Sequence, residues 1–258
     1  EKTGDKALAT ALDFVAKIKK TPIVVNDTRG FFVNRCVFRY INEAYDMLAE
    51  GVPATMIENA AKMAGMPVGP LSLNDEVAVD LSQKIMKASI ADLGEASVKP
   101  GHMTLIDKMV NELDRRGRKN GQGFYDYPPK PAKKSLWPGL KDLYPQKPAS
   151  EVDVTVLKQR FLVTIALEAA RTVEEGIVTD PREADVGSIL GFGFAPYTGG
   201  TLSYIDGMGV KTFVELAEKL AAQYGSHFKP TQLLKDMAAN GETFYGRFDP
   251  YAKIGQAA

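Results

Sequence analysis

Apolar residues recur at helical spacing along most of the chain, and this pattern sets the expected fold. Residues 5–20 place their large apolar side chains on one face of a predicted helix: Leu8, Leu12, Val15 and Ile18. Thr21 and Pro22 predict its end. The β-branched run at 23–25 then predicts a short strand. A helix followed by one buried strand is typical of the last unit of an α/β domain, so residues 1–28 are expected to be a remnant of one.

Beyond Gly30 strand signals almost vanish, and the pattern predicts helices separated by Gly and Pro. A loop is expected at 66–75 and an irregular, Gly- and Pro-rich connector at 117–150. Helices are expected at about 31–50, 53–65, 73–93, 103–116, 153–175, 181–190, 210–224 and 231–240. The predicted fold class is therefore all-α.

The second half of the chain repeats the order of the first. Five residues recur 125 positions later: Arg35, Glu43, Ala44, Glu50 and Gly51 become Arg160, Glu168, Ala169, Glu175 and Gly176. A Pro-led helix follows each glycine. These matches predict two tandem copies of one helical domain. The expected boundaries are 1–28 for the remnant, 29–127 for the first copy, 128–150 for the connector and 151–258 for the second copy.

Composition narrows the class of partner. The 258 residues are 45% hydrophobic and 25% charged, and 32 Lys and Arg balance 32 Asp and Glu. This balance predicts no nucleic-acid surface. The single Cys36 forms no internal disulfide. We find neither an apolar run long enough to span a bilayer nor a signal segment, so the cytoplasm or an organelle matrix is expected, without secretion.

Common cofactor and metal motifs are missing from the sequence. Gly191 and Gly193 approach a dinucleotide fingerprint, but they follow a predicted helix where that motif needs a strand. No phosphate loop or paired-cysteine metal motif occurs. His102 and His227 lie in polar, turn-like segments and are expected to face solvent, because neither has a carboxylate at helical spacing for acid–base work. No catalytic, cofactor-binding or metal-binding residue is therefore predicted.

The segment from Gly30 to Arg35 is more informative. Asn34 is expected in the first turn of a helix, where its amide could bond the helix end or contact a ligand at a domain junction. Both interpretations stay open on the residues alone. Internal ion pairs between the two copies are predicted in preference to acid–base chemistry for four residues: Arg35, Glu43, Arg160 and Glu168.

The connector region is basic. Its cations are Arg115, Arg116, Arg118, Lys119, Lys130, Lys133 and Lys134. A solvated loop is the simpler interpretation, and contact with the phosphates of an anionic ligand is the alternative.

Long stretches of the chain resemble a known family. GFFVNR at 30–35, NEAYDMLAEGV at 42–52 and GMPVGPLSLNDEVAVD at 65–80 are similar to the start of the C-terminal domain of 3-hydroxyacyl-CoA dehydrogenases, and GRKNGQGFYDY at 117–127 to the end of that domain. Residues 168–209 resemble a second copy, as in multifunctional fatty-acid oxidation proteins. Ala195 departs from the family's pattern at a proline position.

The resemblance implies NAD-dependent oxidation of the 3-hydroxyl of an acyl-CoA in β-oxidation. The family's NAD site and His–Glu pair lie in an N-terminal Rossmann domain, of which residues 1–28 match only the final helix and strand. The isolated chain is therefore expected to be inactive. Asn34 is the family residue that carries over, with its amide near the reacting oxygen of the substrate. The resemblance also implies a homodimer or its intramolecular mimic, and a thiolase subunit as partner.

Three alternatives remain. The chain could be a helical dimerisation or docking module without a catalytic share. It could be a self-sufficient enzyme with a site around His102 or His227. The parent could also be a dehydrogenase acting on 3-hydroxybutyryl-CoA alone.

Overall fold

The computed structural model describes residues 3–248, and these are almost entirely helical, which confirms the all-α prediction. The α-helices are α1 (Asp5–Lys17), α2 (Val33–Ala49), α3 (Ala54–Met63), α4 (Pro70–Val77), α5 (Val79–Leu93), α6 (Pro100–Asp107), α7 (Leu140–Leu143), α8 (Val154–Glu174), α9 (Pro181–Phe192), α10 (Thr201–Met208), α11 (Val210–Tyr224), α12 (Gln232–Asn240) and α13 (Phe244–Arg247). Short 3₁₀ turns cover Glu95–Ser97, Arg118–Asn120, Ala149–Glu151, Pro196–Thr198 and Ser226–Phe228, and a π turn covers Lys108–Glu112. The strands are β1 (Tyr125–Asp126) and β2 (Ser135–Leu136).

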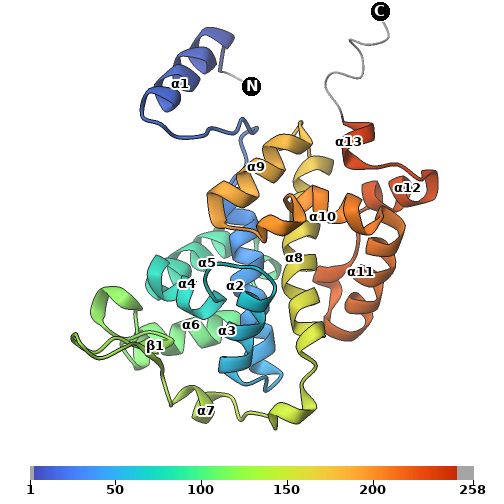
Figure 1. Cartoon of the computed structure of the whole chain (residues 1–258). Coiled ribbons are helices and arrows are strands. Elements are labelled where there is room, and N and C mark those ends of the chain that lie inside the picture. The colour runs from blue at the N-terminus through green and yellow to red at the C-terminus, as the bar shows by residue number, and fades with distance from the viewer. Residues whose placement is uncertain (1–2, 249–258) are drawn as a thin grey trace, which may run out of the picture. The chain divides into compact units, whose positions relative to one another are not determined.

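The chain divides into two compact units. Unit 1 combines residues up to 39 with those from 162 onward, and unit 2 is residues 40–161. The chain passes from one unit to the other within α2 and again within α8, and both helices are labelled in Figure 1. The domain boundaries at 28, 127 and 150 stay predictions.

The core of unit 2 is built on the later part of α2. This part buries large side chains at helical spacing: Tyr40, Ile41, Ala44, Tyr45, Met47 and Leu48. Tyr40 packs edge-on against Phe161, with 5.1 Å between ring centroids. Gly51, with φ at +82°, ends the helix in a left-handed conformation that costs glycine little. Pro53 then precedes α3 as the spacing predicts.

The core of unit 1 is built on the later part of α8 and on the helices that follow it. The buried side chains of α8 are Val163, Ile165, Ala166, Leu167, Ala169 and Ala170. Helix α11 buries Phe213, Ala217 and Leu220, and α12 buries Leu234 and Met237. The three- and four-residue spacing of these positions produces the helical stripe seen in the sequence.

One predicted loop contains a helix. Residues 66–75 were expected to be irregular, but α4 begins at Pro70, and α5 begins only at Val79. Buried Glu58 explains the start of α4, because its carboxylate accepts the backbone N–H of Leu71 at 2.8 Å in the first turn. Ala78, with φ at +88°, separates α4 from α5. Helix α10 is likewise not predicted from the sequence. Its first turn is held by buried Asp185, whose carboxylate accepts the N–H of Leu202 at 2.7 Å.

The strand predicted at 23–25 was wrong. These residues form no strand or bridge in the described chain. Instead the backbone N–H of Val24 donates to Glu183 and that of Asn26 donates to the carbonyl of Ile177. A β-branched run pairs as a strand only beside another strand, and here its neighbours are a side chain of α9 and the loop that precedes α9.

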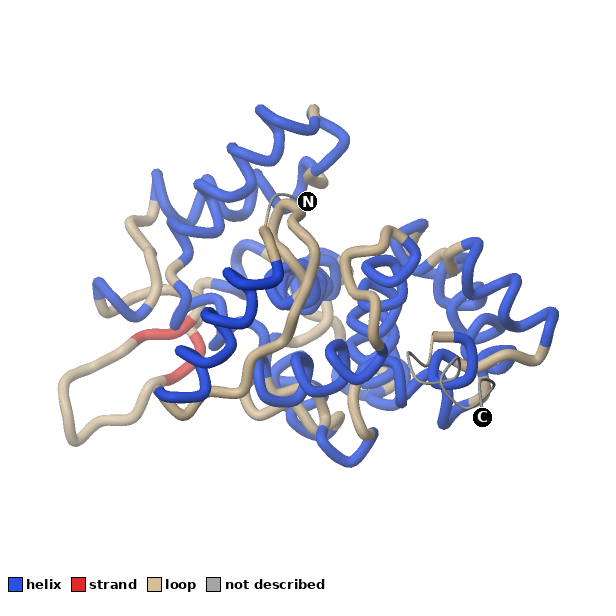
Figure 2. Tube along the Cα trace, turned by 90° about the horizontal axis from the view of Figure 1, so that it is seen from above, coloured by secondary structure: helices blue, strands red, loops and turns tan. Residues whose placement is uncertain are grey.

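The connector at 117–150 is more ordered than expected. Tyr125 pairs with Leu136 in the antiparallel β1–β2 ribbon, and the loop between the strands extends away from them (Figure 2). Helix α7 follows. Across the described residues, no helix is long and apolar enough to cross a membrane.

Candidate functional site

Asn34 is an exposed side chain in the first turn of α2. The chain enters this turn through Gly30, with φ at +77°, and Phe31, with φ at +49°. The Asn34 side chain makes no hydrogen bond with another described residue. Its amide is therefore available to a group from outside the chain.

Helix α9 lies against the start of α2. A Cβ added to Gly191 would stand 3.1 Å from Cγ2 of Val33, so glycine allows this close approach. The rings of Phe32 and Phe192 are 6.5 Å apart. Large apolar side chains in this part of unit 1 stay exposed: Phe31, Leu190 and Tyr197. Asn34 thus belongs to a segment that also presents apolar surface, a combination typical of ligand or protein contacts.

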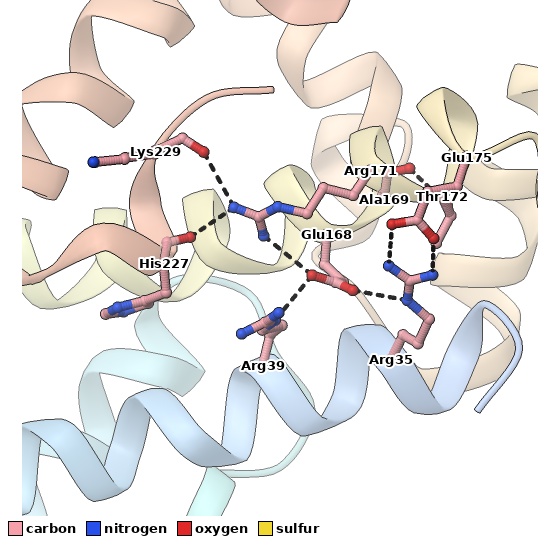
Figure 3. Close-up of polar contacts among 9 residues, drawn as sticks. All are labelled: Arg35, Arg39, Glu168, Ala169, Arg171, Thr172, Glu175, His227 and Lys229. Carbon is pink, nitrogen blue, oxygen red and sulfur yellow. Dashed lines mark hydrogen bonds and ion pairs between the residues drawn. The ribbon is translucent and has the colours of Figure 1, made fainter. Parts of the chain in front are cut away.

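Arg35 anchors a polar cluster in unit 1 (Figure 3). Its Nε donates to Glu168 at 2.8 Å, and its two terminal nitrogens donate to the two carboxylate oxygens of Glu175. Arg39 reaches Glu168 at 2.9 Å and Arg171 reaches it at 3.1 Å. One buried carboxylate therefore accepts bonds from three guanidinium groups.

Arg171 is held by more than Glu168. Its Nη2 also donates to the backbone carbonyls of His227 at 2.8 Å and Lys229 at 3.1 Å (Figure 3). Burial opposes ionisation of Glu168, but the charges of Arg39, Arg171 and Arg35 outweigh it and lower the pKa of this carboxyl. Burial, together with the neighbouring guanidinium groups, lowers the pKa of Arg171.

Arg160 anchors the corresponding cluster in unit 2. Its Nε donates to Glu43 at 2.6 Å, and its terminal nitrogens donate to Glu50 at 2.5 and 2.7 Å. The Arg160 side chain is only 1% exposed. Burial disfavours its charge, but hydrogen bonds and attraction to Glu50 and Glu43 raise its pKa overall.

The four residues singled out as ion-pair candidates therefore lie in two separate pairs, Arg35 with Glu168 and Arg160 with Glu43. The further partners Glu50 and Glu175 were not predicted from the sequence. Both follow the predicted glutamate by seven residues, two helical turns on the same face, and this spacing could have identified them.

His102 is buried, which contradicts the prediction that it faces solvent. Its Nε2 lies 2.8 Å from a carboxylate oxygen of Asp46, which Lys99 also contacts at 2.6 Å. The partner comes from a different helix, so helical spacing could not reveal it. Burial opposes ionisation of Asp46, but the hydrogen bond to His102 helps to lower its pKa. His227 is half-buried beside Phe228, with ring centroids 4.3 Å apart.

The first part of the basic stretch is neutralised within unit 2. Arg115 is buried, donates to the carbonyl of Gly123 at 2.7 Å and pairs with Asp126. The cations that follow also have carboxylate partners: Arg116 with Asp114, Arg118 with Glu76, and Lys119 with Asp80. The solvated-loop interpretation is therefore wrong for Arg115.

Two buried carboxylates in unit 2 have counterparts in unit 1. Asp75 accepts the backbone N–H groups of Phe124 and Tyr125, both at 2.8 Å. Asp206 accepts those of Phe244 and Tyr245. The hydroxyl of Tyr125 donates to Glu58, and that of Tyr245 donates to Asp185. The same kinds of contact thus occur once in each unit.

The described residues do not fit a dinucleotide cofactor. A dinucleotide fold needs a parallel sheet with a glycine turn between strand and helix. Residues 3–248 contain only the antiparallel β1–β2 pair, and Gly193 follows the end of α9.

Comparison with known proteins finds a family that matches part of the chain. Residues 30–127 match the family described as "3-hydroxyacyl-CoA dehydrogenase, C-terminal domain". Residues 30–127 are therefore similar to this C-terminal domain.

Its relatives are longer proteins. The chain is 40% identical over 245 residues to "Fatty acid oxidation complex subunit alpha" of Shewanella halifaxensis, and 42% identical over 247 residues to the protein of the same name from Shewanella amazonensis. Each match covers 95% of this chain and 34% of the relative. The chain thus spans about a third of the length of the curated relatives it matches.

Solved structures share the fold. The crystal structure of 3-hydroxybutyryl-CoA dehydrogenase from Escherichia coli K12 is similar at a TM-score of 0.70 and 20% identity, covering 93% of this chain and 66% of that one. The dehydrogenase part of multifunctional enzyme 1 from C. elegans is similar at a TM-score of 0.64 and 22% identity, covering 89% and 53%.

Proposed function

We propose that this chain is the C-terminal helical part of an NAD-dependent 3-hydroxyacyl-CoA dehydrogenase of fatty-acid β-oxidation, where it helps to form the acyl-CoA site. The observation that carries the proposal is the 40% identity to fatty acid oxidation complex subunit alpha over 95% of the chain. The match of residues 30–127 to the family's C-terminal domain supports it. NAD is bound outside the residues described, since these do not fit it.

The role proposed for Asn34 is to hold the substrate near its reacting oxygen. Its exposed amide, with no partner in the described chain, supports this role. During hydride transfer, the charge on the substrate oxygen changes, and a neutral N–H donor can stabilise that charge. An amide does this without being a titratable group itself. The exposed Phe31 in the preceding turn offers apolar surface to the same ligand.

The helical packing is proposed to be a duplicated domain that mimics a dimer within one chain. The recurrence of the Asp75 contacts at Asp206, and of the Arg160 cluster at Arg35, supports duplication. A shared ancestor of both halves would place the same carboxylates at the same helix ends. A thiolase subunit as partner and a cytoplasmic or matrix location remain parts of this proposal, for which the relatives' membership of a fatty acid oxidation complex is the support.

Enzyme assays test the proposal directly. The complete polypeptide that carries this chain should oxidise NADH with acetoacetyl-CoA, and the 258-residue chain alone should show no turnover. Turnover by the chain alone that survives repurification, and that is lost in a His102→Ala variant, would favour the self-sufficient enzyme instead.

Chain-length preference separates the remaining alternatives. We expect the complete polypeptide to reduce 3-ketoacyl-CoA substrates of several chain lengths. Activity confined to the four-carbon substrate would identify a 3-hydroxybutyryl-CoA dehydrogenase. A complete polypeptide without any dehydrogenase activity would leave the helical docking module as the better account.

A further inference from the structure

A cavity of unit 2 is not used by the proposed dehydrogenase role. It has a volume of ≈ 500 Å³ and lies between α3, the β1–β2 ribbon and α7, whose positions can be followed in Figure 1. The size is within the usual range for small-molecule sites, about 300–1,000 Å³. Its lining combines charged and aromatic side chains: Glu58, Lys62, Tyr125, Lys134, Trp137 and Lys141.

Three lysine ammonium groups line this cavity, and the charge of one of them, Lys62, acts on the carboxyl of Glu58. Lys62 lies on α3, Lys134 immediately precedes β2, and Lys141 lies on α7. Within residues 3–248 none of the three forms an ion pair, unlike the arginines at 115, 116 and 118. Like charges that line one cavity repel each other, so a bound anion would relieve an unfavourable interaction that the chain itself leaves in place.

One of these lysines is already oriented. The Nζ of Lys134 bonds to the hydroxyl of Ser72 at 2.5 Å and lies 4.8 Å from the ring centroid of Tyr125. An ammonium held over an aromatic face keeps its charge and loses less freedom when a ligand binds. This geometry favours binding of an anionic ligand by Lys134 more than a freely solvated lysine side chain would.

The acidic group of the cavity does not neutralise the lysines. The carboxylate of Glu58 is buried and accepts the hydroxyl of Tyr125 at 2.6 Å and the N–H of Leu71 at 2.8 Å. Its burial raises its pKa, while its hydrogen bonds and the charge of Lys62 oppose that rise, and this one carboxyl faces three ammonium groups. Lysines therefore dominate the electrostatics of the wall.

We propose that this cavity binds a phosphorylated small molecule of about nucleotide size. Phosphate groups would pair with Lys62, Lys134 and Lys141, because clustered ammonium groups act as point charges for phosphate. The apolar part of the lining would cover the rest of the molecule: Ala54, Leu136, Trp137, Pro138 and Leu140. The proposal does not rest on the dehydrogenase assignment. A free nucleotide and the phosphate-bearing end of coenzyme A share the chemistry that it requires.

The chain provides its own reporter for this site. Trp137 lines the cavity and is the single tryptophan of the 258 residues. Tryptophan fluorescence of the chain should therefore change saturably as ADP is added, with a Kd on the order of 10–100 µM. The affinity should fall as salt rises, because salt screens the lysine charges. A fluorescence signal that does not change, together with no heat of binding in calorimetry, would overturn the proposal.

Two double variants that each remove two positive charges distinguish binding in the cavity from non-specific attraction of ADP to the positive charges of the chain. Lys62→Gln with Lys141→Gln removes two cavity charges and should weaken ADP binding about tenfold or more. Lys211→Gln with Lys219→Gln removes two charges from the exposed face of α11 and should leave Kd unchanged. Equal weakening by both pairs would mean non-specific anion adsorption and would contradict a built site.

Further probes identify the source of the phosphate. Coenzyme A that binds more tightly than ADP would assign the cavity to the coenzyme, and ADP that binds at least as tightly would assign it to a free nucleotide. Tripolyphosphate that matches ADP would show that the phosphates alone carry recognition. All three results support the phosphate site, and their readout is independent of dehydrogenase activity.

Discussion

The two arginine clusters have the same plan but different surroundings. In unit 2, Arg160 is 1% exposed and pairs with Glu43 and Glu50. In unit 1, the corresponding Arg35 is 18% exposed and pairs with Glu168 and Glu175, while two further arginines converge on Glu168. The Arg160 cluster is the more buried of the two and is called the closed cluster. The Arg35 cluster, in which three arginines converge on Glu168, is called the open cluster.

Two sequence positions account for this difference. Arg39 corresponds to Thr164 in the repeat, and Arg171 corresponds to Asp46. Asp46 bonds His102 in unit 2, while Arg171 bonds the carbonyls of His227 and Lys229 in unit 1. Residues that are the same in both copies thus form the ion pairs. Residues that differ between the copies, at 39 and 164 and at 46 and 171, determine how many further charges lie beside those pairs.

The largest effect is expected at the closed cluster. Arg160→Ala should lower the free energy of unfolding by about 3–5 kcal/mol, because it leaves buried Glu43 without its cation. Urea unfolding of the 258-residue chain measures this loss. Lys211→Ala on exposed α11 is the control and should change stability by less than about 0.5 kcal/mol. A loss at Arg160 as small as the control would show that the buried pair contributes little.

A smaller loss is expected at the open cluster. Glu168→Gln should cost about 2 kcal/mol, since the three arginines left behind keep some contact with water. The lowered pKa of Glu168 adds a pH signature: its stabilisation is present above the unfolded pKa and is lost as pH falls through the folded value. The variant should therefore lose less stability than the parent on acidification below about pH 4.5. Equal acid sensitivity would contradict the network.

The buried carboxyl group of Asp75, whose counterpart in unit 1 is Asp206, gives a further prediction at pH values near neutrality. Burial raises the pKa of Asp75 to about 6, although N–H groups of Phe124 and Tyr125 oppose the shift. The contribution of Asp75 to the free energy of unfolding is fully present below the pKa of the unfolded state and is lost as pH rises through about 6. The expected loss is roughly 1–2 kcal/mol. Unfolding at pH 5 and pH 7.5 should show this slope, and Asp75→Asn should flatten it. A variant with the same slope as the parent would assign the effect elsewhere.

The smallest effect is expected at the exposed edge of the open cluster. Glu175→Gln should cost about 0.5–1 kcal/mol, because the Glu175 side chain is 47% exposed and Arg35 keeps Glu168. A double-mutant cycle with Arg35→Ala measures the coupling. Coupling above about 2 kcal/mol would mean that solvent screens this pair less than its exposure suggests.

The sequence predicted ion pairs at two pairs of repeated residues but not the further partners Glu50 and Glu175, and it failed where single residues act at a distance. The recurrence of Arg35 and Glu43 was enough to propose the pairs. Helix α10 and the buried state of His102 depend on partners many residues away, and local patterns carry no sign of them. The strand predicted at 23–25 failed because β-branched residues show a preference, while a strand also requires a neighbour.

Kinetics of Asn34 variants test the central claim most directly. In the complete polypeptide, Asn34→Ala should lower kcat for acetoacetyl-CoA reduction by about 10²–10³-fold, the cost of one donor to a developing charge. Asn240→Ala, at the exposed end of α12, is the matched control and should leave kcat unchanged. An Asn34→Ala enzyme with the kcat and KM of the parent would contradict the substrate role and leave the chain a helical docking module.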